Sequence, residues 1–483
     1  MRSARVLALA LFVQTSLASA QIPRPVAKAL SDAGIAQDHV AIVVQRVDAT
    51  QPLVSHQPDV PMNPASTMKL VTTFAALELL GRDYRWRTEA YLGAPLVDGT
   101  LRGDLILKGY GDPKITIEQW QSFMRELRAR GLEHIEGDLV LDRTHFRVAK
   151  HDPSLFDGEP LRPYNVGPDA LLVNFKALRF AFVPNAAGDA VDLAVEPPLP
   201  QVAVGNPPLL VDGPCSDWRG QLSAAFINQP RVAAATFPGI YSRNCGARDW
   251  YLSLLDHQNY VHGMFSTYFA QAGGTFGGAV RDGRAPAKTT PFAVLESPPL
   301  YDIVRDVNKL SNNVMARQVF LTLATTGGQA PPATVEKATA AIERWLTTRA
   351  LAMPGFAIEN GSGLSRTERV TAAGLARLLA VADASAVRNE FATSLAVAAT
   401  DGTLERRMVN GNAAGQALLK TGSLEGVRAL AGYVIDARGV RWITVAIVNH
   451  PNAVRATPAL DALAEWVYRE SGRQTPQRLP HRR

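Results

Sequence analysis

Ser66 and Lys69 are the two residues whose types and spacing point most directly to chemistry. Residues at positions i and i+3 share one face of a helix, so the serine hydroxyl and the lysine amine can meet. A serine activated by a lysine is an alternative to the Ser-His-Asp triad in nucleophilic catalysis. The motif alone is weak, because an S-x-x-K is expected about once by chance in a chain of this length. A capping serine followed by a solvated lysine is the alternative interpretation.

The helix that would position this pair has recognisable ends. Asn63 is a favourable N-cap, Pro64 suits the first helical position, and Gly81 follows the apolar run of residues 70–80. Ser66 would then lie in the first turn, where unpaired backbone N–H groups and the helix dipole favour developing negative charge. This is a favourable place for a nucleophile that passes through an anionic intermediate.

A second polar motif, Ser311-Asn312-Asn313, falls between two helix-like stretches at residues 300–310 and 314–323. The spacing predicts a turn from which Ser311 and Asn313 can point into a cleft. Ser and Asn also favour ordinary helix-linking turns, which is the alternative interpretation.

A third motif, Lys420-Thr421-Gly422-Ser423, ends an apolar stretch and is predicted to lie on a strand. A glycine within a strand indicates the close approach of a ligand or of another backbone. The lysine and the hydroxyls could hold a substrate carboxylate, and the N–H of Ser423 could join that of Ser66 as an oxyanion hole. An exposed edge strand protected by a lysine is the alternative.

The elements at the two ends of the chain predict one α+β domain, with an antiparallel sheet covered by helices. The β-branched stretch 40–47 is a predicted strand. Further strands are predicted at 417–421, 429–435 and 441–448, with a hairpin turn at 436–439 and a final helix from 457 to about 472.

The region between these ends is a large β-rich insertion, rich in Pro and Gly and containing short apolar strands and one amphipathic helix at 115–130. We therefore expect a signal peptide (1–20), a discontinuous catalytic domain (21–80 and 295–472), an inserted domain II (81–108 and 188–294), a nested inserted domain III (109–187) and a disordered basic tail (473–483).

Composition sets limits on the class of protein. The chain has 483 residues, 47% hydrophobic and 19% charged residues and a net charge of +6, as in ordinary globular proteins. Two arginines before a short apolar run, and a small-residue cleavage site ending at Ala20, predict a secretory signal peptide and a periplasmic mature protein. A retained anchor is the alternative, but the run is too short to span a bilayer. No transmembrane segment is expected in the mature chain, and nothing indicates nucleic-acid binding.

Cys215 and Cys245 are the only two cysteines of the chain. In a secreted protein they predict an intrachain disulfide, with two free thiols as the alternative. Two cysteines are too few for a cysteine zinc site, and the histidines show no metal-ligand spacing, so neither a metal nor another cofactor is expected.

Taken together and in this order, the S-x-x-K, S-x-N and K-T-G motifs resemble those of the penicilloyl serine transferase superfamily. The surrounding sequences are similar to the D-alanyl-D-alanine carboxypeptidase/endopeptidase family of low-molecular-mass class C penicillin-binding proteins, whose long insertion follows the first motif. The resemblance covers nearly the whole mature chain and rests on the segments 64–69, 108–113, 360–366, 401–404 and 420–423. Asn312 departs from the Asp that many superfamily members carry.

The resemblance implies a β-lactamase/transpeptidase-like fold and a periplasmic serine carboxypeptidase that acts on peptidoglycan stem peptides, with endopeptidase activity and covalent inhibition by β-lactam antibiotics. Ser66 would be the nucleophile, Lys69 its base and Ser311 a proton relay. The substrate-binding residues would be Asn313, Lys420, Thr421, Gly422 and Ser423.

Two alternatives remain at this stage. A β-lactamase would need a deacylating glutamate, and Glu159 lacks the surrounding motif of class A enzymes. A catalytically silent wall-binding scaffold would need none of the three motifs.

Overall fold

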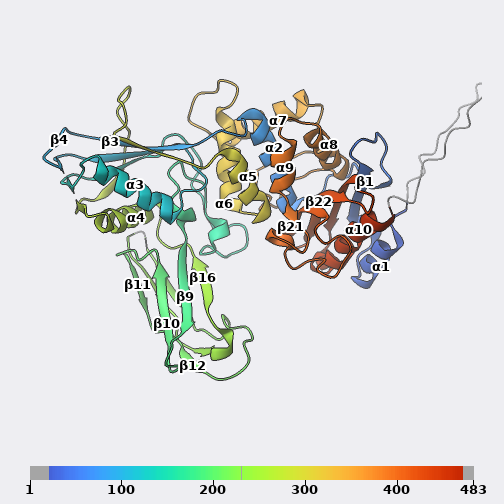
Figure 1. The fold of residues 1–483 in the computed structure, drawn as a ribbon, viewed down its shortest axis with the longest axis horizontal. Helices are drawn as coiled ribbons and strands as arrows, with labels where there is room; N and C mark the ends of the chain where they lie inside the picture. Colours follow the sequence, from blue (N-terminus) through green and yellow to red (C-terminus); the bar gives the residue numbers. More distant parts are fainter. Residues whose placement is uncertain (1–20, 230, 471–483) are drawn as a thin grey trace, which may run out of the picture.

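The computed structural model describes residues 21–229 and 231–470, so the predicted signal peptide and basic tail lie outside the described residues. The molecule is elongated (Figure 1). One end, here called the sheet body, contains elements α1–α2 and α5–α10 with the largest sheet. The other end, here called the inserted unit, contains elements β3–β19.

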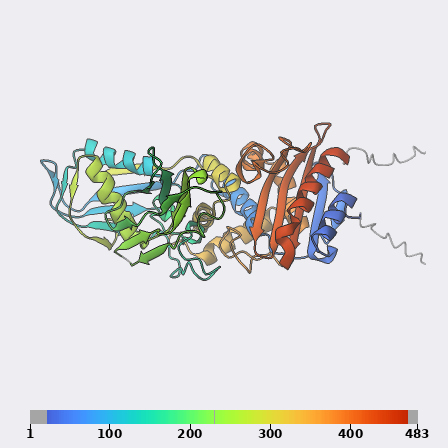
Figure 2. The same cartoon turned by 90° about the horizontal axis from the view of Figure 1, so that it is seen from below.

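The sheet body is built on six antiparallel strands that come from both ends of the chain, as the sequence predicted. In Figure 2 the first strand lies beside strands from the C-terminal part. The strand order is β2 (Val54–His56), β1 (Val40–Arg46), β23 (Arg441–Asn449), β22 (Val427–Ile435), β21 (Ala417–Leu424), β20 (Ala396–Val397).

Both faces of this sheet are buried, which explains the unbroken apolar runs of its central strands. In β1, Val40, Ile42 and Val44 pack with the core under α1 and α10, whereas Ala41 and Val43 pack with the core under α2 and α8. This alternation fixes the register, because a slip by one residue would exchange the two faces.

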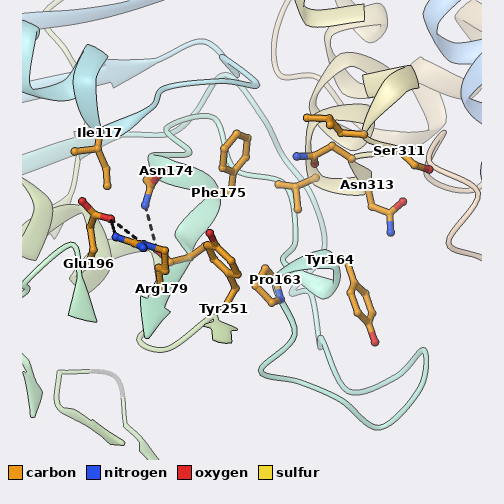
Figure 3. Close-up of a pocket in the computed structure, with 14 residues that line it drawn as sticks. Ile117, Pro163, Tyr164, Asn174, Phe175, Arg179, Glu196, Tyr251, Ser311 and Asn313 are labelled. Carbon is orange, nitrogen blue, oxygen red and sulfur yellow. Dashed lines mark hydrogen bonds and ion pairs between the residues drawn. The ribbon is translucent and has the colours of Figure 1, made fainter. Parts of the chain in front are cut away.

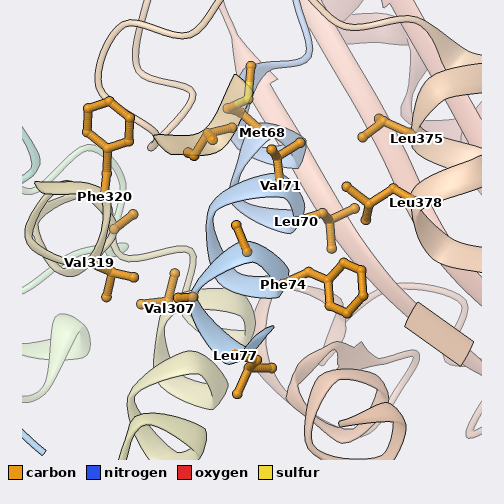
Figure 4. Close-up of a cluster of buried hydrophobic side chains, with 14 of the residues drawn as sticks. Met68, Leu70, Val71, Phe74, Leu77, Val307, Val319, Phe320, Leu375 and Leu378 are labelled. Atoms are coloured by element: carbon orange, nitrogen blue, oxygen red, sulfur yellow. The ribbon is translucent and has the colours of Figure 1, made fainter. Parts of the chain in front are cut away.

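Helices cover both faces of the sheet. They are α1 (Arg24–Asp32), α2 (Lys69–Leu79), α5 (Leu300–Lys309), α6 (Asn313–Thr322), α7 (Val335–Thr348), α8 (Ala372–Asp383), α9 (Arg388–Ser394) and α10 (Thr457–Glu470). Figure 4 shows α2 at the centre of the larger core, with Phe74 facing Leu378 on one side and Val307 and Val319 on the other. The helix that follows the S-x-x-K motif is therefore apolar all round because it is surrounded by other helices and the sheet.

The inserted unit contains five smaller sheets and two long helices, α3 (Ile117–Ala129) and α4 (His257–Gln271). A five-stranded sheet has the order β18 (Val280–Asp282), β8 (Leu139–Asp142), β6 (Leu105–Gly109), β3 (Arg87–Leu92), β19 (Ala293–Glu296). A four-stranded one has the order β17 (Thr275–Phe276), β7 (His134–Ile135), β5 (Thr100–Leu101), β4 (Leu96–Val97).

The remaining sheets of the inserted unit lie at its tip. Their orders are β10 (Val191–Glu196), β9 (Leu178–Pro184), β16 (Arg248–Leu252); β11 (Val202–Gly205), β14 (Ala233–Thr236), β13 (Ala225–Asn228); and β12 (Leu209–Val211), β15 (Ile240–Ser242). Cys215 and Cys245 form a disulfide in this part.

Strand pairing crosses the predicted boundaries of the nested domain at 109–187. Strand β8 pairs with β6, which lies outside that range, and β9 pairs with β10 and β16 across residue 187. Hydrogen-bonded ladders of this kind do not divide between domains, so we propose a tip subdomain from about residue 178 to 252 instead. The sequence could not place this boundary, because it depends on which strands pair and not on composition.

Candidate active site

The S-x-x-K motif lies on a short 3₁₀ turn, Ala65–Met68, that leads directly into α2. The sequence predicted an α-helix from Pro64, and the structure differs in this first turn. Ala65 has a left-handed backbone (φ 45°), and its N–H donates to Oδ1 of Asn63 at 2.9 Å. Asn63 is not the N-cap that the sequence predicted, because that position is Pro64, which offers no side-chain cap; Asn63 instead holds the N–H of Ala65. Non-glycine residues in that conformation cluster at functional sites, where the surrounding structure holds them.

Lys69 is fully buried at the start of α2 and is surrounded by acceptors. Its Nζ donates to Oγ of Ser66 at 2.9 Å, to Oδ1 of Asn313 at 2.6 Å and to the carbonyl oxygen of Ser362. Burial, and next the positive charge of Lys420, hold the pKa of Lys69 well below the ordinary lysine value. A buried amine with a lowered pKa beside a serine hydroxyl can act as the base that takes the serine proton.

A loop that the motifs did not identify contacts this lysine through the carbonyl of Ser362. Oε1 of the buried Glu368 accepts the N–H groups of Glu359, Asn360 and Gly361 at 3.0–3.1 Å, and these residues lead to the carbonyl of Ser362. Burial raises the pKa of Glu368, against the three backbone N–H groups and Lys69, which lower it. The motifs assign no role to residues 360–366, for which the glycine-rich N-G-S-G pattern is the local signal in the sequence.

One glycine of this loop is required by close packing. A Cβ on Gly363 would lie 2.0 Å from the carbonyl oxygen of Ala65, and the residue has φ +81°. The loop therefore lies directly against the turn that carries Ser66, and only glycine fits there.

Ser311 lies on the turn between α5 and α6, as the sequence predicted, and Asn313 is the first residue of α6. Asn312 caps α6 through a hydrogen bond from the N–H of Met315 to its Oδ1 at 3.0 Å. Either Asn or Asp can provide this cap, which explains how Asn can stand at this position. Ser311 has a left-handed backbone (φ 55°), and its Oγ accepts a hydrogen bond from Nζ of Lys420 at 2.8 Å.

The K-T-G motif lies on β21, at the margin of the sheet that faces the nucleophile. Lys420 is fully buried, and burial lowers its pKa to about 7. A Cβ on Gly422 would lie 2.6 Å from the carbonyl oxygen of Pro64, so the strand approaches the Ser66 turn closely, as expected for a glycine within a strand. Thr421 and Ser423 line the same cleft as Ser66.

This cleft has a volume of about 790 Å³ and brings together residues of all three motifs, namely Ser66, Ser311, Asn313, Thr421 and Ser423. Its far wall comes from the inserted unit through Phe156, Asp157 and Tyr164. The cleft therefore lies between the sheet body and the inserted unit.

Three arginines that sequence reasoning did not assign also line the cleft. Arg366 lies 4.8 Å from the ring centroid of Phe156 and 3.2 Å from a carboxylate oxygen of Glu425. Arg428 stands opposite Ser423 on β22, and Arg407 is paired with Asp461. Arg428 donates to the backbone carbonyls of Leu424 and Val427, so its charge favours an anionic group in the cleft; a single arginine carries no motif that would reveal this from sequence.

Two further findings concern only the described residues. No group of three or more His, Cys, Asp or Glu side chains could hold a metal ion among residues 21–229 and 231–470. No helix in the described part of the chain is long and apolar enough to cross a membrane.

Known proteins resemble this chain over most of its length. The model of the D-Ala-D-Ala carboxypeptidase 3 (S13) family matches residues 23–469. The chain is 25% identical over 416 residues to D-alanyl-D-alanine carboxypeptidase DacB of Haemophilus influenzae, covering 85% of each chain. It is 28% identical over 439 residues to the D-alanyl-D-alanine carboxypeptidase of an Actinomadura species, covering 86% of this chain and 78% of the relative.

The fold is also found among solved structures. Penicillin-binding protein 4 (dacB) from Haemophilus influenzae superposes with a TM-score of 0.74 at 22% identity, covering 92% of this chain and 99% of the other. A second structure of that protein, complexed with a novel β-lactam, gives a TM-score of 0.70 at 22% identity, covering 89% of this chain and 96% of the other. The predicted transpeptidase-like α+β fold with extra domains is thus confirmed.

Proposed function

We propose that Ser66 is the nucleophile of this chain, which belongs to the D-Ala-D-Ala carboxypeptidase 3 (S13) family and is therefore a D-Ala-D-Ala carboxypeptidase. The observation that carries this proposal is the buried Lys69 amine, 2.9 Å from Oγ of Ser66 and held there by Asn313 and Ser362. The substrate class is the peptidoglycan stem peptide that ends in D-Ala-D-Ala.

In the acylation step, neutral Lys69 accepts the Ser66 proton and Oγ of Ser66 attacks the carbonyl of the scissile bond. The backbone N–H groups of Ser66 and Ser423 stabilise the oxyanion. Ser311, hydrogen-bonded to Lys420, passes a proton to the leaving amine as the bond to nitrogen breaks. Water then hydrolyses the ester and releases the shortened peptide.

Substrate binding uses the polar groups that line the cleft. Asn313 hydrogen-bonds the peptide backbone, and Thr421 and Ser423 bind the terminal carboxylate beside the positive charges of Lys420 and Arg428. A cross-linked neighbouring peptide as the leaving group gives endopeptidase activity by the same steps. A β-lactam presents a reactive amide and a carboxylate to the same groups, and so acylates Ser66.

Two other functions fit the geometry less well. Glu159, the glutamate considered for a β-lactamase mechanism, is exposed, lies 3.4 Å from Arg162 and does not line the cleft. A silent scaffold would not require a buried lysine with a lowered pKa at the nucleophile, because burying an amine is costly. The predicted location is the periplasm, where peptidoglycan lies, after cleavage behind Ala20.

The direct test is release of D-alanine from a pentapeptide ending in D-Ala-D-Ala by the purified mature protein. We expect release by the wild type and none by Ser66→Ala. A wild-type protein that binds cell wall but releases no D-alanine would support the scaffold and contradict the proposal.

A further inference from the structure

A second hollow adjoins the active-site cleft on the side of the inserted unit. It has a volume of about 570 Å³ and shares Tyr164, Ser311 and Asn313 with the cleft, so the two spaces are neighbours. Figure 3 shows Phe175, Tyr251 and Pro163 between the Ser311 turn and the more distant Arg179–Glu196 pair.

The walls of this hollow leave large apolar side chains partly uncovered. On the inserted unit Tyr251 is 48% exposed, and on the sheet body Leu310, next to Ser311, is 65% exposed. The main polar groups are Arg179 and Glu196, which form an ion pair at 2.6 Å. An apolar hollow with a small number of placed polar groups is typical of a binding site.

The backbone that presents Phe175 is unusual. Asn174, Phe175 and Lys176 are three consecutive non-glycine residues with left-handed φ angles of 45°, 53° and 51°. Hydrogen bonds from the Asn174 side chain to the Ala177 carbonyl and to the Tyr260 hydroxyl hold this turn, both at 3.0 Å. Such conformations are costly and persist at sites where the surroundings enforce them, often beside ligands.

The position of the hollow indicates which part of a substrate it would take, given the proposed function on which this inference rests. Ser311 gives the proton to the leaving amine, and the hollow begins at Ser311. In the carboxypeptidase reaction the leaving group is a single D-alanine, which Thr421 and Ser423 hold within the cleft. In the endopeptidase reaction the leaving amine carries a whole neighbouring peptide, which needs space beyond Ser311.

We propose that this hollow is the subsite for the leaving peptide of a cross-linked substrate. Tyr251 and Phe175 provide apolar contacts for its side chains, and the Arg179–Glu196 pair hydrogen-bonds its backbone. In this acylation step the amide bond to the leaving nitrogen breaks and the ester to Ser66 forms. The proton lost by Ser66 ends on the leaving nitrogen.

The test compares a cross-linked muropeptide dimer with a monomeric pentapeptide, using the full mature protein. In Tyr251→Ala we expect kcat/KM for dimer cleavage to fall about tenfold, as for loss of an aromatic contact in a binding site. D-alanine release from the monomer should stay within about twofold of wild type. Tyr251→Phe, which keeps the ring, should retain dimer cleavage. Tyr301→Ala removes a comparably exposed tyrosine outside the hollow and should change neither reaction.

Three results would overturn this assignment. They are equal losses on dimer and monomer, no loss on either, and a wild-type protein that releases D-alanine but never cleaves the dimer. Absence of D-alanine release together with absence of a penicillin adduct would instead overturn the proposed function itself, so the two failures are distinguishable.

Discussion

At the scale of single residues, two buried lysines control the site. Lys69 contacts the nucleophile and Lys420 contacts Ser311, and burial lowers the pKa of both amines. Their roles require opposite charge states, since a base must be neutral and a carboxylate-binding group must be charged. The rate of the reaction should therefore depend on the protonation states of both lysines.

Replacing the base tests the first of these roles. In Lys69→Met the apolar side chain suits the buried position, so the fold should remain, but nothing can accept the Ser66 proton. We expect penicillin acylation to slow by roughly a thousandfold, within the range for loss of a general base. Lys28→Met, at an exposed lysine on α1, is the matched control and should react normally. Near-normal acylation of Lys69→Met would exclude Lys69 as the base.

The pH dependence of kcat/KM for D-alanine release tests both charge states together. As the pH falls through the lowered pKa of Lys69, the amine gains a proton and can no longer act as a base, so the rate falls. As the pH rises above about 7, Lys420 loses its charge, because burial lowers its pKa to that value, and carboxylate binding weakens. We therefore expect a bell-shaped profile.

The alkaline side of this profile can be assigned separately. Lys420→Arg keeps a positive charge at every accessible pH, because a guanidinium does not lose its proton there. Whatever its overall rate, this variant should lack the fall above neutral pH. A fall of the same shape in the variant would show that Lys420 is not the responsible group.

At the scale of elements, close backbone approaches bring together the S-x-x-K turn, the K-T-G strand and the 360–363 loop. Strand β21, the 360–363 loop and the 3₁₀ turn meet at Gly422 and Gly363, where no Cβ fits. Lys69 reaches the carbonyl of Ser362 because the loop lies this close to the turn.

A single added methyl group tests this packing. In Gly422→Ala the new Cβ would lie 2.6 Å from the carbonyl oxygen of Pro64, so strand and nucleophile turn must separate. We expect penicillin acylation to fall by roughly a hundredfold, as small displacements in active sites do. The matched control is Gly277→Ala, where a Cβ meets nothing within 4 Å, and it should acylate normally. Equal rates in the two variants would show that the approach is not required.

The sequence predicted the elements that carry the motifs because their signals are local. The β-branched runs of β1 and β23, the 436–439 turn and the S-x-N turn depend on neighbouring residues, and the structure has them at the expected places. The 3₁₀ turn at Ser66 was missed because its tighter winding depends on the loop packed against it. Helix α4 was missed because it is buried on most sides and lacks a clear amphipathic pattern.

The partners of the catalytic groups were only partly predictable. The three motifs gave Ser66, Lys69, Ser311 and Lys420 through their spacing and the family resemblance. Glu368 holds a loop whose Ser362 carbonyl meets Lys69 across 293 residues of chain, and a single buried glutamate leaves no pattern in one sequence. Such contacts depend on tertiary packing, which local propensity does not encode.

At the scale of the whole molecule, the inserted unit provides one wall of the cleft. Its tip lines the neighbouring hollow through Arg179, Glu196 and Tyr251 and then extends away from both. The tip carries the Cys215–Cys245 disulfide, whose cysteines are 30 residues apart. A loop of this length is typically stabilised by about 3–4 kcal/mol through its disulfide. The tip should therefore depend on the disulfide far more than the sheet body does.

Replacing both cysteines by serine tests this division of the molecule. We expect faster hydrogen exchange and proteolysis within residues 178–252, because the unfolded tip gains freedom. Penicillin acylation should stay within about twofold of wild type, since no cleft residue lies in the tip. Loss of acylation in parallel with the tip would show that the two parts unfold as one unit.

The central claim is that Ser66 becomes covalently acylated and that the acyl-enzyme lasts. The most direct measurement is incubation of the purified mature protein with penicillin, followed by mass spectrometry of its peptides over time. We expect a long-lived adduct on the peptide that contains Ser66, and none in Ser66→Ala. An adduct on another residue, an adduct that turns over rapidly, or no adduct at all would contradict it.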